Sequence, residues 1–542
     1  MHDILPFICI IHKRPAPAPD SGNLRCKYEL IGFPNYQGPT EVARLMFVVT
    51  ETEWTDTIFV GDLAFKHLQA GTPLMPTGCL PMLIDHSSPS LGRVSEYLAV
   101  FPCAAMNVGL MGTTDSEWSQ NVFLYMAANY SGAFWYGACL KYVGELLGLP
   151  PEEANDFKRF FLPSTEDQAL LSTPERMNKL KVWLHECYSS DKKLLQMEKY
   201  LSGRQQGNNI FLIGDRVSMA DISLFLDMLR LYGRQIVREA MPDFRQRFPA
   251  LVRHFETILR EFPQLLEYLK DPSRHYKPTY AFLNQCEAVY SYGDLFDSIN
   301  DNDESEDTGI DRDVEANSTN PIAQALKAIE VATLSGEELH TVILDEERPC
   351  FQGSLKLLGV EVAPPSSRAE NSPANGCCDL DAILELLPEH LVFKFAWIFV
   401  ANAKGMLGAT TATRTKNLQM FSVVAFLLAT YSTNSKDFFK KEVLDRSRSG
   451  AMYTNVSPGN VQYLEILIEM NGIDGKDGVV CRKSSDNAGK MSLADAGIYL
   501  FVQTILGDKE IIQCEDDERA LREQFPLLMK AYSLLKKQWN LE

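Results

Sequence analysis

Two matching helix-start patterns, far apart in the chain, constrain its fold more than any other feature. In the first, Ser218 is followed three positions later by Asp221, and in the second, Ser492 stands in the same relation to Asp495. A Ser hydroxyl can accept from free amides of a first helical turn, and an acid three residues on can accept from the Ser amide. Apolar residues then recur at helical spacing in both places: Ile222, Phe225, Leu226 and Leu229, and Ile498, Phe501, Val502 and Ile505. Each pattern predicts an amphipathic helix that begins beside the Ser.

A second shared pattern lies downstream of each helix start. Phe248-Pro249 and Phe525-Pro526 each precede an apolar helical stretch. The apolar positions are Leu251, Phe255 and Ile258 in the first stretch, and Leu528, Tyr532 and Leu535 in the second. Because two features recur together and in the same order, the sequence predicts an internal repeat.

The overall composition narrows the classes of protein to consider. A chain of 542 residues exceeds the usual size of one domain, so we expect several. The net charge of −19 has the wrong sign for a broad nucleic-acid surface or for docking on anionic membranes. The twelve cysteines include no Cys-x-x-Cys pair, which indicates reduced thiols in a cytoplasmic protein.

Two apolar runs, Ile4–Ile11 and Phe421–Leu428, are too short to span a bilayer. The first also lacks the basic start of a signal peptide. We therefore predict no transmembrane segment. We expect the first run to be a tail that packs on the surface or stays mobile, within an N-terminal extension formed by residues 1–25.

Residues 26–100 alternate between strand and helix patterns, which predicts a small α/β domain. Residues 101–275 carry helical patterns throughout and predict an all-α domain. In the first of these domains, strands are expected at Lys27–Phe33, Trp54–Val60 and Gly78–Ile84, and helices at Thr40–Phe47 and Arg93–Phe101.

Four further motifs lie in the first half of the chain. They are Tyr28–Phe33 with Glu41 and Arg44, Gly78-Cys79-Leu80-Pro81, Glu96-Tyr97-Leu98-Ala99, and Gly109-Leu110-Met111-Gly112. Together with the Ser218/Asp221 box, they resemble the cytosolic glutathione transferases, most of all the sigma-type branch. In that family they would be the first strand and helix, the element with a cis-proline, the end of the glutathione-binding helix and the join to the helical domain. The resemblance implies a thioredoxin-like domain that carries glutathione, followed by helices that form a pocket for the second substrate.

The resemblance places a thiol-activating hydroxyl at the end of the first strand. A hydroxyl that donates to sulfur stabilises the thiolate, which is the nucleophile. The matching position is Gly32, which has no side chain to donate. Tyr36, in the following loop, is the candidate donor, and the alternative for Tyr36 is an ordinary surface or packing role.

The resemblance also assigns residues to the peptide and the carboxylate of glutathione. With Pro81 in the cis form, the backbone of Leu80 would pair with glutathione like an added strand. If Glu96-Tyr97-Leu98 matches the end of the family's glutathione-binding helix, the residues that would hold the γ-glutamyl carboxylate are Ser90 and Leu91. The side chain of Leu91 cannot form a hydrogen bond. Ser90 either holds the carboxylate or only caps the helix, while Glu96 brings charge of the wrong sign nearby.

Residues 276–320 are predicted to be a linker with an acidic insertion. Between Asp294 and Glu315 there are ten acids and one base, which favours a solvated loop. The spacing of the acids lacks the Gly and the terminal Glu of an EF-hand, so no metal site is predicted. Tyr290 and Tyr292, just before the insertion, are either thiol-activating residues of a second unit or ordinary strand residues.

The remaining sequence repeats the order of the first half in weaker form. Residues 321–390 predict a degenerate thioredoxin-like domain, with strands at Leu339–Leu344 and Leu358–Val362 but no clear Gly-x-Leu-Pro element. Residues 391–542 predict a second all-α domain. The expected fold is therefore α/β plus all-α, repeated in tandem, with the ligand end of the second unit eroded.

Two functions follow from the resemblance. The first is a glutathione transferase or glutathione-dependent isomerase with a weakened site, with glutathione as co-substrate and a hydrophobic electrophile as second substrate. Aromatic residues near Tyr125 and Tyr130 either line the electrophile pocket or belong to the core. The second function is a non-catalytic scaffold or interaction protein. A fused pair can satisfy internally the interface that single units use to dimerise, so we expect an internal pseudo-dimer, with a homodimer as the alternative.

Overall fold

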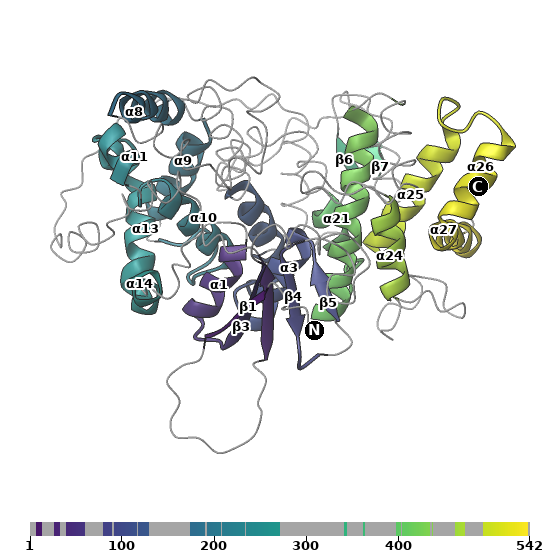
Figure 1. The fold of residues 1–542 in the computed structure, drawn as a ribbon, viewed down its shortest axis with the longest axis horizontal. Coiled ribbons are helices and arrows are strands. Elements are labelled where there is room, and N and C mark those ends of the chain that lie inside the picture. Colours follow the sequence, from purple (N-terminus) through teal and green to yellow (C-terminus); the bar gives the residue numbers. More distant parts are fainter. Residues whose placement is uncertain are drawn as a thin grey trace, which may run out of the picture.

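The computed structural model of the chain is shown in Figure 1. It describes residues 7–12, 27–32, 40–59, 80–88, 92–115, 117–128, 174–189, 192–206, 209–233, 235–270, 341–343, 361–363, 397–402, 404–433, 436, 461–471 and 491–539. A sheet occupies the middle, with the helices of residues 174–270 on one side and those of residues 397–539 on the other (Figure 1). Among the described residues, no helix is both long enough and apolar enough to cross a membrane.

The sheet contains five strands in the order β1-β3-β2-β4-β5. The strands are β1 (Phe7–His12), β2 (Tyr28–Gly32), β3 (Trp54–Phe59), β4 (Met82–Asp85) and β5 (Arg93–Ser95). Strands β2 and β3 are parallel and are connected through α1 (Thr40–Val49), whereas β4 runs antiparallel to β2, and β5 antiparallel to β4. A β-α-β unit extended by two antiparallel strands is a thioredoxin-like arrangement, and it confirms the α/β prediction for the start of the chain.

Strand β1 was not expected. The sequence predicted a tail at the N-terminus, but Phe7–His12 pairs antiparallel with β3, so that His12 lies opposite Trp54 and Phe7 opposite Phe59. The physical reason is the open edge of β3, whose backbone N–H and C=O groups need partners that a strand can supply.

The predicted helix Arg93–Phe101 is confirmed from Tyr97 onward and wrong before it. Residues Arg93–Ser95 pair with β4 as strand β5, and the helix α3 (Tyr97–Val108) begins after them. Glu96 separates the two elements with φ 75° and ψ 124°, a backbone conformation that cannot continue either one. The predicted domain boundary at residue 100 falls inside α3.

Helix α1 is buried along its whole length, and its two charged residues form a closed ion-pair cluster. The guanidinium Nε of Arg44 donates to both carboxylate oxygens of Asp56 at 3.0 Å, and one terminal nitrogen donates to Glu41 at 3.2 Å. Trp54 donates from its indole nitrogen to Asp56 at 3.2 Å. Burial acts to lower the pKa of Arg44, but Asp56 and Glu41 outweigh it and raise that pKa above its usual value. Each buried charge is therefore paired, as a fully buried charge must be.

Helices make up the rest of the described chain. After α3, residues 117–128 are helical, followed by α8 (Pro174–Ser189), α9 (Lys192–Gln206), α10 (Met219–Arg230), α11 (Gln235–Ala240), α12 (Phe244–Arg247), α13 (Pro249–Glu261) and α14 (Pro263–Lys270). In the second half, residues 397–402 are helical, followed by α21 (Thr411–Thr433), α24 (Val461–Asn471), α25 (Leu493–Gly507), α26 (Glu515–Gln524) and α27 (Pro526–Trp539). Strands β6 (Thr341–Ile343) and β7 (Glu361–Ala363) pair in parallel where two short strands were expected.

Both predicted helix starts are confirmed. Ser218 caps α10 and Ser492 caps α25, each Ser hydroxyl accepting from the amide of the Asp three residues on. In return, Asp221 accepts from the Ser218 amide at 2.9 Å, and Asp495 accepts from the Ser492 amide at 3.2 Å. Local sequence alone is enough to specify such caps because both partners lie within one helical turn.

The two halves share further polar contacts at matching places. Glu198 accepts from the amides of Ala250 and Leu251 at the start of α13, at 2.9 and 2.8 Å. Glu465 accepts from the amides of Leu527 and Leu528 at the start of α27, at 2.6 and 2.7 Å. In both cases a carboxylate from another helix satisfies the free N–H groups that follow a Phe-Pro pair.

A second shared contact involves one asparagine in each half. Asn121 donates to the Leu110 carbonyl at 2.8 Å and accepts from the Ala220 amide at 2.8 Å. Asn417 donates to the Leu407 carbonyl at 3.0 Å and accepts from the Ala494 amide at 3.1 Å. Each asparagine thereby ties the loop before its own helix to the start of the capped helix.

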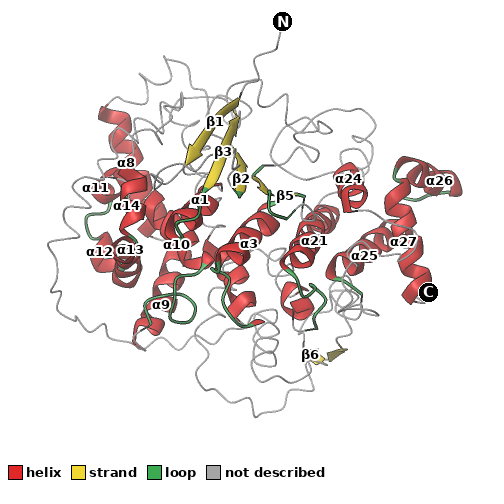
Figure 2. Cartoon of the chain, turned by 90° about the horizontal axis from the view of Figure 1, so that it is seen from below, coloured by secondary structure: helices red, strands yellow, loops and turns green. Residues whose placement is uncertain are grey.

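Helix α3 connects the two halves. It lies between α10 and α21 when the molecule is seen from below (Figure 2) and packs against both. Asn402 donates to the Asp115 carbonyl and to Ser119, both at 2.8 Å, and Arg414 pairs with the Asp115 carboxylate at 2.9 Å. The interface between the halves is therefore a packed one with buried hydrogen bonds.

Candidate functional site

Three chain segments meet at one edge of the sheet. In the strand pairing, Ile31 near the end of β2 lies opposite Met82 at the start of β4, and Met82 lies opposite Ser95 at the end of β5. The residues that follow or precede these positions are Gly32, Pro81 and Glu96. The end of the first strand, the prolyl turn and the start of α3 therefore form one site, although they are separate in sequence.

Gly32 is packed too closely to carry a side chain. A Cβ atom built there would lie 2.7 Å from Cγ2 and 2.8 Å from Oγ1 of Thr40, the first residue of α1. Thr40 is itself buried and has a short, β-branched side chain that cannot swing far. The strand-end position therefore lacks a hydroxyl, and α1 also fills the space that such a side chain would need. Tyr36, the alternative donor, lies outside the described residues.

The prolyl turn has the predicted form. The Leu80–Pro81 peptide bond is cis, Pro81 is buried and Leu80 is half-buried, directly before β4. The assignment of the Leu80 backbone to glutathione stays a prediction. Ser90 lies outside the described residues.

The start of α3 differs from the prediction in a way that changes the site. Glu96-Tyr97-Leu98 was expected at the end of a helix, but Glu96 is the N-cap and Tyr97 the first residue of α3. The free N–H groups and the positive dipole end of this helix therefore lie beside Tyr97, and not beside Ser90 and Leu91. A non-glycine residue at φ 75° costs about 1–3 kcal/mol, so other contacts must hold Glu96 in place.

The contacts that hold this turn come from the second half of the chain. Tyr463 of α24 donates to a carboxylate oxygen of Glu96 at 3.1 Å, and Ser422 of α21 donates to the other oxygen at 3.4 Å. Ser95 lies 2.9 Å from the Tyr463 hydroxyl and accepts from Gln419 of α21 at 2.8 Å. Ser95, Glu96, Gln419, Ser422 and Tyr463 are all buried, so the cluster is shielded from water.

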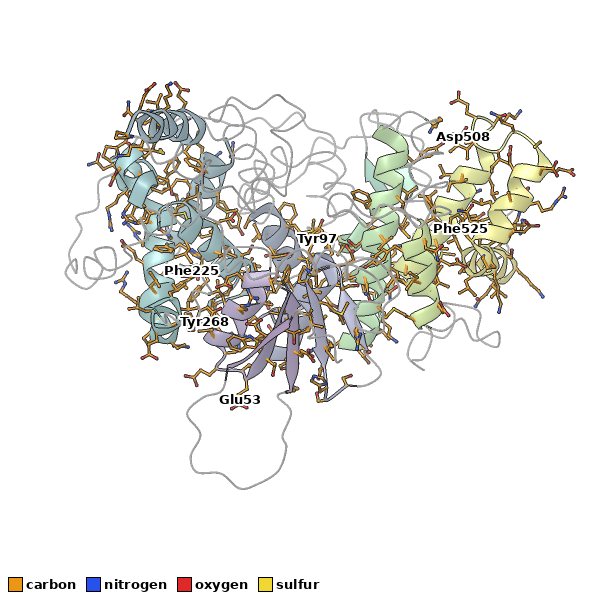
Figure 3. All side chains as sticks on the ribbon, viewed as in Figure 1. Glu53, Tyr97, Phe225, Tyr268, Asp508 and Phe525 are labelled. Atoms are coloured by element: carbon orange, nitrogen blue, oxygen red, sulfur yellow. The ribbon has the colours of Figure 1, made fainter. Side chains whose placement is uncertain are left out.

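Tyr97 is the next residue after Glu96 in the chain. Figure 3 shows it between the sheet and the helices of the second half. Burial, together with the neighbouring Glu96 carboxylate, raises the pKa of Tyr97 well above its usual value. Its hydroxyl therefore stays protonated at neutral pH.

Tyr125 belongs to the core. It has no exposed surface, and its ring meets Phe101 of α3 edge-on at 5.5 Å between centroids. This is the core interpretation left open by the sequence, and it removes Tyr125 from the electrophile pocket. Tyr130 lies outside the described residues.

The two cysteines whose surroundings are described do not suggest thiol chemistry of their own. Burial raises the pKa of Cys103 to about 12, and Cys514 is exposed at the start of the acidic helix α26. No group of three or more His, Cys, Asp or Glu side chains that could hold a metal occurs within the described ranges.

The sequence did not predict that α3 begins at Tyr97, or that residues of the second half contact Glu96. The apolar run Leu98–Ala105, which ends just before Gly109, was the signal for a helix that begins at Tyr97. No sequence signal links Ser95 to Tyr463, because they are 368 positions apart and meet only through tertiary packing.

Residues 178–272 match the family model of the glutathione S-transferase C-terminal domain. This segment of the chain is therefore similar to that domain of the glutathione S-transferases. The matched segment contains α9 to α14, including the capping box at Ser218 and the Glu198 contact to α13. No curated protein matches the chain.

Solved transferase structures are also similar to the chain. The enzyme from Ascaris lumbricoides is 17% identical, with 46% of this chain and 99% of that one covered and a TM-score of 0.30. The sigma class transferase of Fasciola hepatica is 19% identical, with 47% and 99% covered and a TM-score of 0.30. The Pi-class transferase of Onchocerca volvulus is 18% identical, with 45% and 92% covered and a TM-score of 0.30.

Proposed function

We propose that the protein is a cytoplasmic glutathione S-transferase-like protein that binds glutathione at the shared edge of β2, β4 and α3. The observation that carries the proposal is the convergence of Gly32, the cis Leu80–Pro81 bond and the start of α3 at that edge. The backbone of Leu80 would pair with the peptide of glutathione, and the first amides of α3 would face a carboxylate. Neither contact depends on side-chain identity.

The proposed chemistry is the attack of the glutathione thiolate on a hydrophobic electrophile, or an isomerisation that uses the same thiolate. We expect it to be slow. Gly32 cannot donate to the sulfur, and Thr40 closes the space beside it. Glu96 adds negative charge next to the helix start that would receive a carboxylate. Tyr36 is the proposed hydroxyl donor, and Ser90 a further contact to glutathione.

We further propose that the chain consists of two transferase-like units of the sigma type, the second with a degenerate thioredoxin-like domain. The paired caps at Ser218 and Ser492 support this, as do the paired carboxylate contacts of Glu198 and Glu465. The two units would form an internal pseudo-dimer through α3 and α21. Light scattering tests this: a mass near 61.0 kDa supports it, and a mass near twice that value argues for a homodimer.

A second candidate function is a non-catalytic interaction protein built on the transferase fold. The observation that favours it is the cluster around Glu96, since Tyr463 and Ser422 engage this carboxylate within the protein. In that case the start of α3 serves the contact between the halves and not a ligand.

Calorimetry with glutathione, followed by turnover of a generic aryl halide, separates the two functions. The wild type, Tyr36→Phe and the matched control Tyr499→Phe would be compared, because Tyr499 is buried in α25 and packs on Tyr532. Binding with turnover that falls only in Tyr36→Phe supports the enzyme and its donor. If turnover is unaffected by Tyr36→Phe, Tyr36 is not the donor, but the enzyme function stands. If the wild type neither binds glutathione nor turns over the aryl halide, the enzyme function is ruled out.

A further inference from the structure

One group of contacts between the halves ends on two consecutive residues of the β5–α3 junction, Ser95 and Glu96. Gln419 donates to Ser95 at 2.8 Å, and Tyr463 lies 2.9 Å from Ser95 and 3.1 Å from Glu96. Because Tyr463 has one hydroxyl proton, the arrangement that satisfies every group is directional. Gln419 donates to Ser95, Ser95 donates to the Tyr463 oxygen, and Tyr463 donates to Glu96.

Glu96 needs such support. It is one of two non-glycine residues with positive φ among those described, and it lies between strand β5 and helix α3. Its carboxylate is buried, and buried charge is stable only when hydrogen bonds surround it. Donors from α21 and α24 therefore hold both the side chain and, through it, the turn that begins α3.

We infer that Tyr463, with Gln419 and Ser422, forms a set of positioning residues through which the second half of the chain shapes the proposed glutathione site. This inference rests on the proposed function, because the start of α3 is part of that site. The second half would then be a fixed internal partner whose side chains complete the geometry of the first unit. The degenerate ligand-binding part of the proposed second unit is compatible with this role. Positioning of Glu96 requires only α21 and α24, and it does not require a second active site.

The test compares Tyr463→Phe with Asn402→Ala in the full chain. Each variant removes a group that makes two hydrogen bonds across the same interface, but Asn402 contacts Asp115 and Ser119, away from the junction. Two quantities are measured: amide hydrogen exchange of the peptide covering residues 92–100, and the calorimetric Kd for glutathione. In Tyr463→Phe we expect exchange in this peptide to become about tenfold faster and the Kd to weaken, because a buried acceptor loses its donor. Asn402→Ala should leave both unchanged.

Each outcome decides the matter. Equal acceleration of residues 92–100 in both variants, or none in Tyr463→Phe, would overturn the inference, since Tyr463 would then contribute only to general interface stability. Faster exchange with an unchanged Kd would overturn the claim that the positioning reaches the ligand. If the wild type does not bind glutathione, the proposed function fails, and the exchange data alone decide whether the second half holds the junction.

Discussion

Asp221 joins several buried donors in the first helical domain, and its removal should be costly. Its carboxylate accepts from the amides of Leu212 at 2.8 Å and Ser218 at 2.9 Å, and it lies 2.9 Å from Nε2 of His254. Asp221 and His254 have no exposed surface, and Leu212 has none either. Water therefore cannot replace the lost acceptor without entering the core.

The magnitude follows from these contacts. A buried donor left without a partner costs about 1–3 kcal/mol, and loss of a helix cap alone costs about 1 kcal/mol. For Asp221→Ala we expect a loss of about 3–5 kcal/mol, less than the simple sum because neighbouring groups relax. Asp495→Ala is the matched control. Asp495 is also buried, but Ser492 is partly exposed and its amide is 3.2 Å from the carboxylate, so we expect the smaller loss there, about 1–2 kcal/mol.

Peptide-resolved hydrogen exchange at increasing urea is the suitable assay, because it follows the two halves of a multidomain chain separately. Asp221→Ala should speed exchange of α10 and α13 by about 100- to 4000-fold, at 1.4 kcal/mol per factor of ten, and leave α25 and α27 unchanged. Asp495→Ala should act on α25 and α27 only. Equal effects of the two variants, or a loss below about 1 kcal/mol for Asp221→Ala, would refute the reasoning from buried donors.

Three further predictions concern packing and charge. Gly32→Ala should lower the free energy of unfolding by about 1–3 kcal/mol, because the added methyl group would overpack against Thr40. Gly203→Ala, which places its methyl group in open space on α9, should raise the free energy of unfolding by about 0.5–1 kcal/mol. Urea titrations measure both variants, and equal effects would contradict the packing argument. Arg44→Met should cost about 3–5 kcal/mol because it leaves two buried carboxylates without their cation, and a thermal-melting shift too small for that loss would contradict it. Burial raises the pKa of Glu198 and of Glu465 in the folded protein above the ordinary value of 4.5. The folded state therefore holds these protons more tightly than the unfolded state does. This contribution to the free energy of unfolding is fully present below pH 4.5 and is lost as the pH rises through the raised pKa. Amide hydrogen exchange at the start of α13 and α27, corrected for intrinsic rates, should therefore become faster as the pH rises through the raised pKa. Glu198→Gln should remove this pH dependence for α13 alone. If the pH dependence at α13 is the same in Glu198→Gln, other groups cause it.

The candidate site shows how far sequence reasoning reaches. The cis bond before Pro81 was implied by the resemblance of Gly78-Cys79-Leu80-Pro81 to an element of the glutathione transferases, and the structure has it. The absence of a donor at Gly32 was also visible, but its cause was not: Thr40 occupies the space, and that contact depends on how α1 lies on β2. The start of α3 was placed too early because residues Arg93–Ser95 have no pattern that distinguishes three residues of strand from the first turn of a helix.

The sequence alone determined the features whose partners lie within a few residues of one another. The caps at Ser218 and Ser492 and the amphipathic stripes behind them are of this kind, because one helical turn contains both donor and acceptor. Only the tertiary structure decided the features that need distant partners, namely the pairing of β1 with β3 and the contact of Tyr463 with Ser95 and Glu96. Such contacts depend on strand register and helix packing, which arise when separate elements bury their apolar faces together. For that reason the two helix starts could be read from the chain, whereas the contacts between its two halves could not.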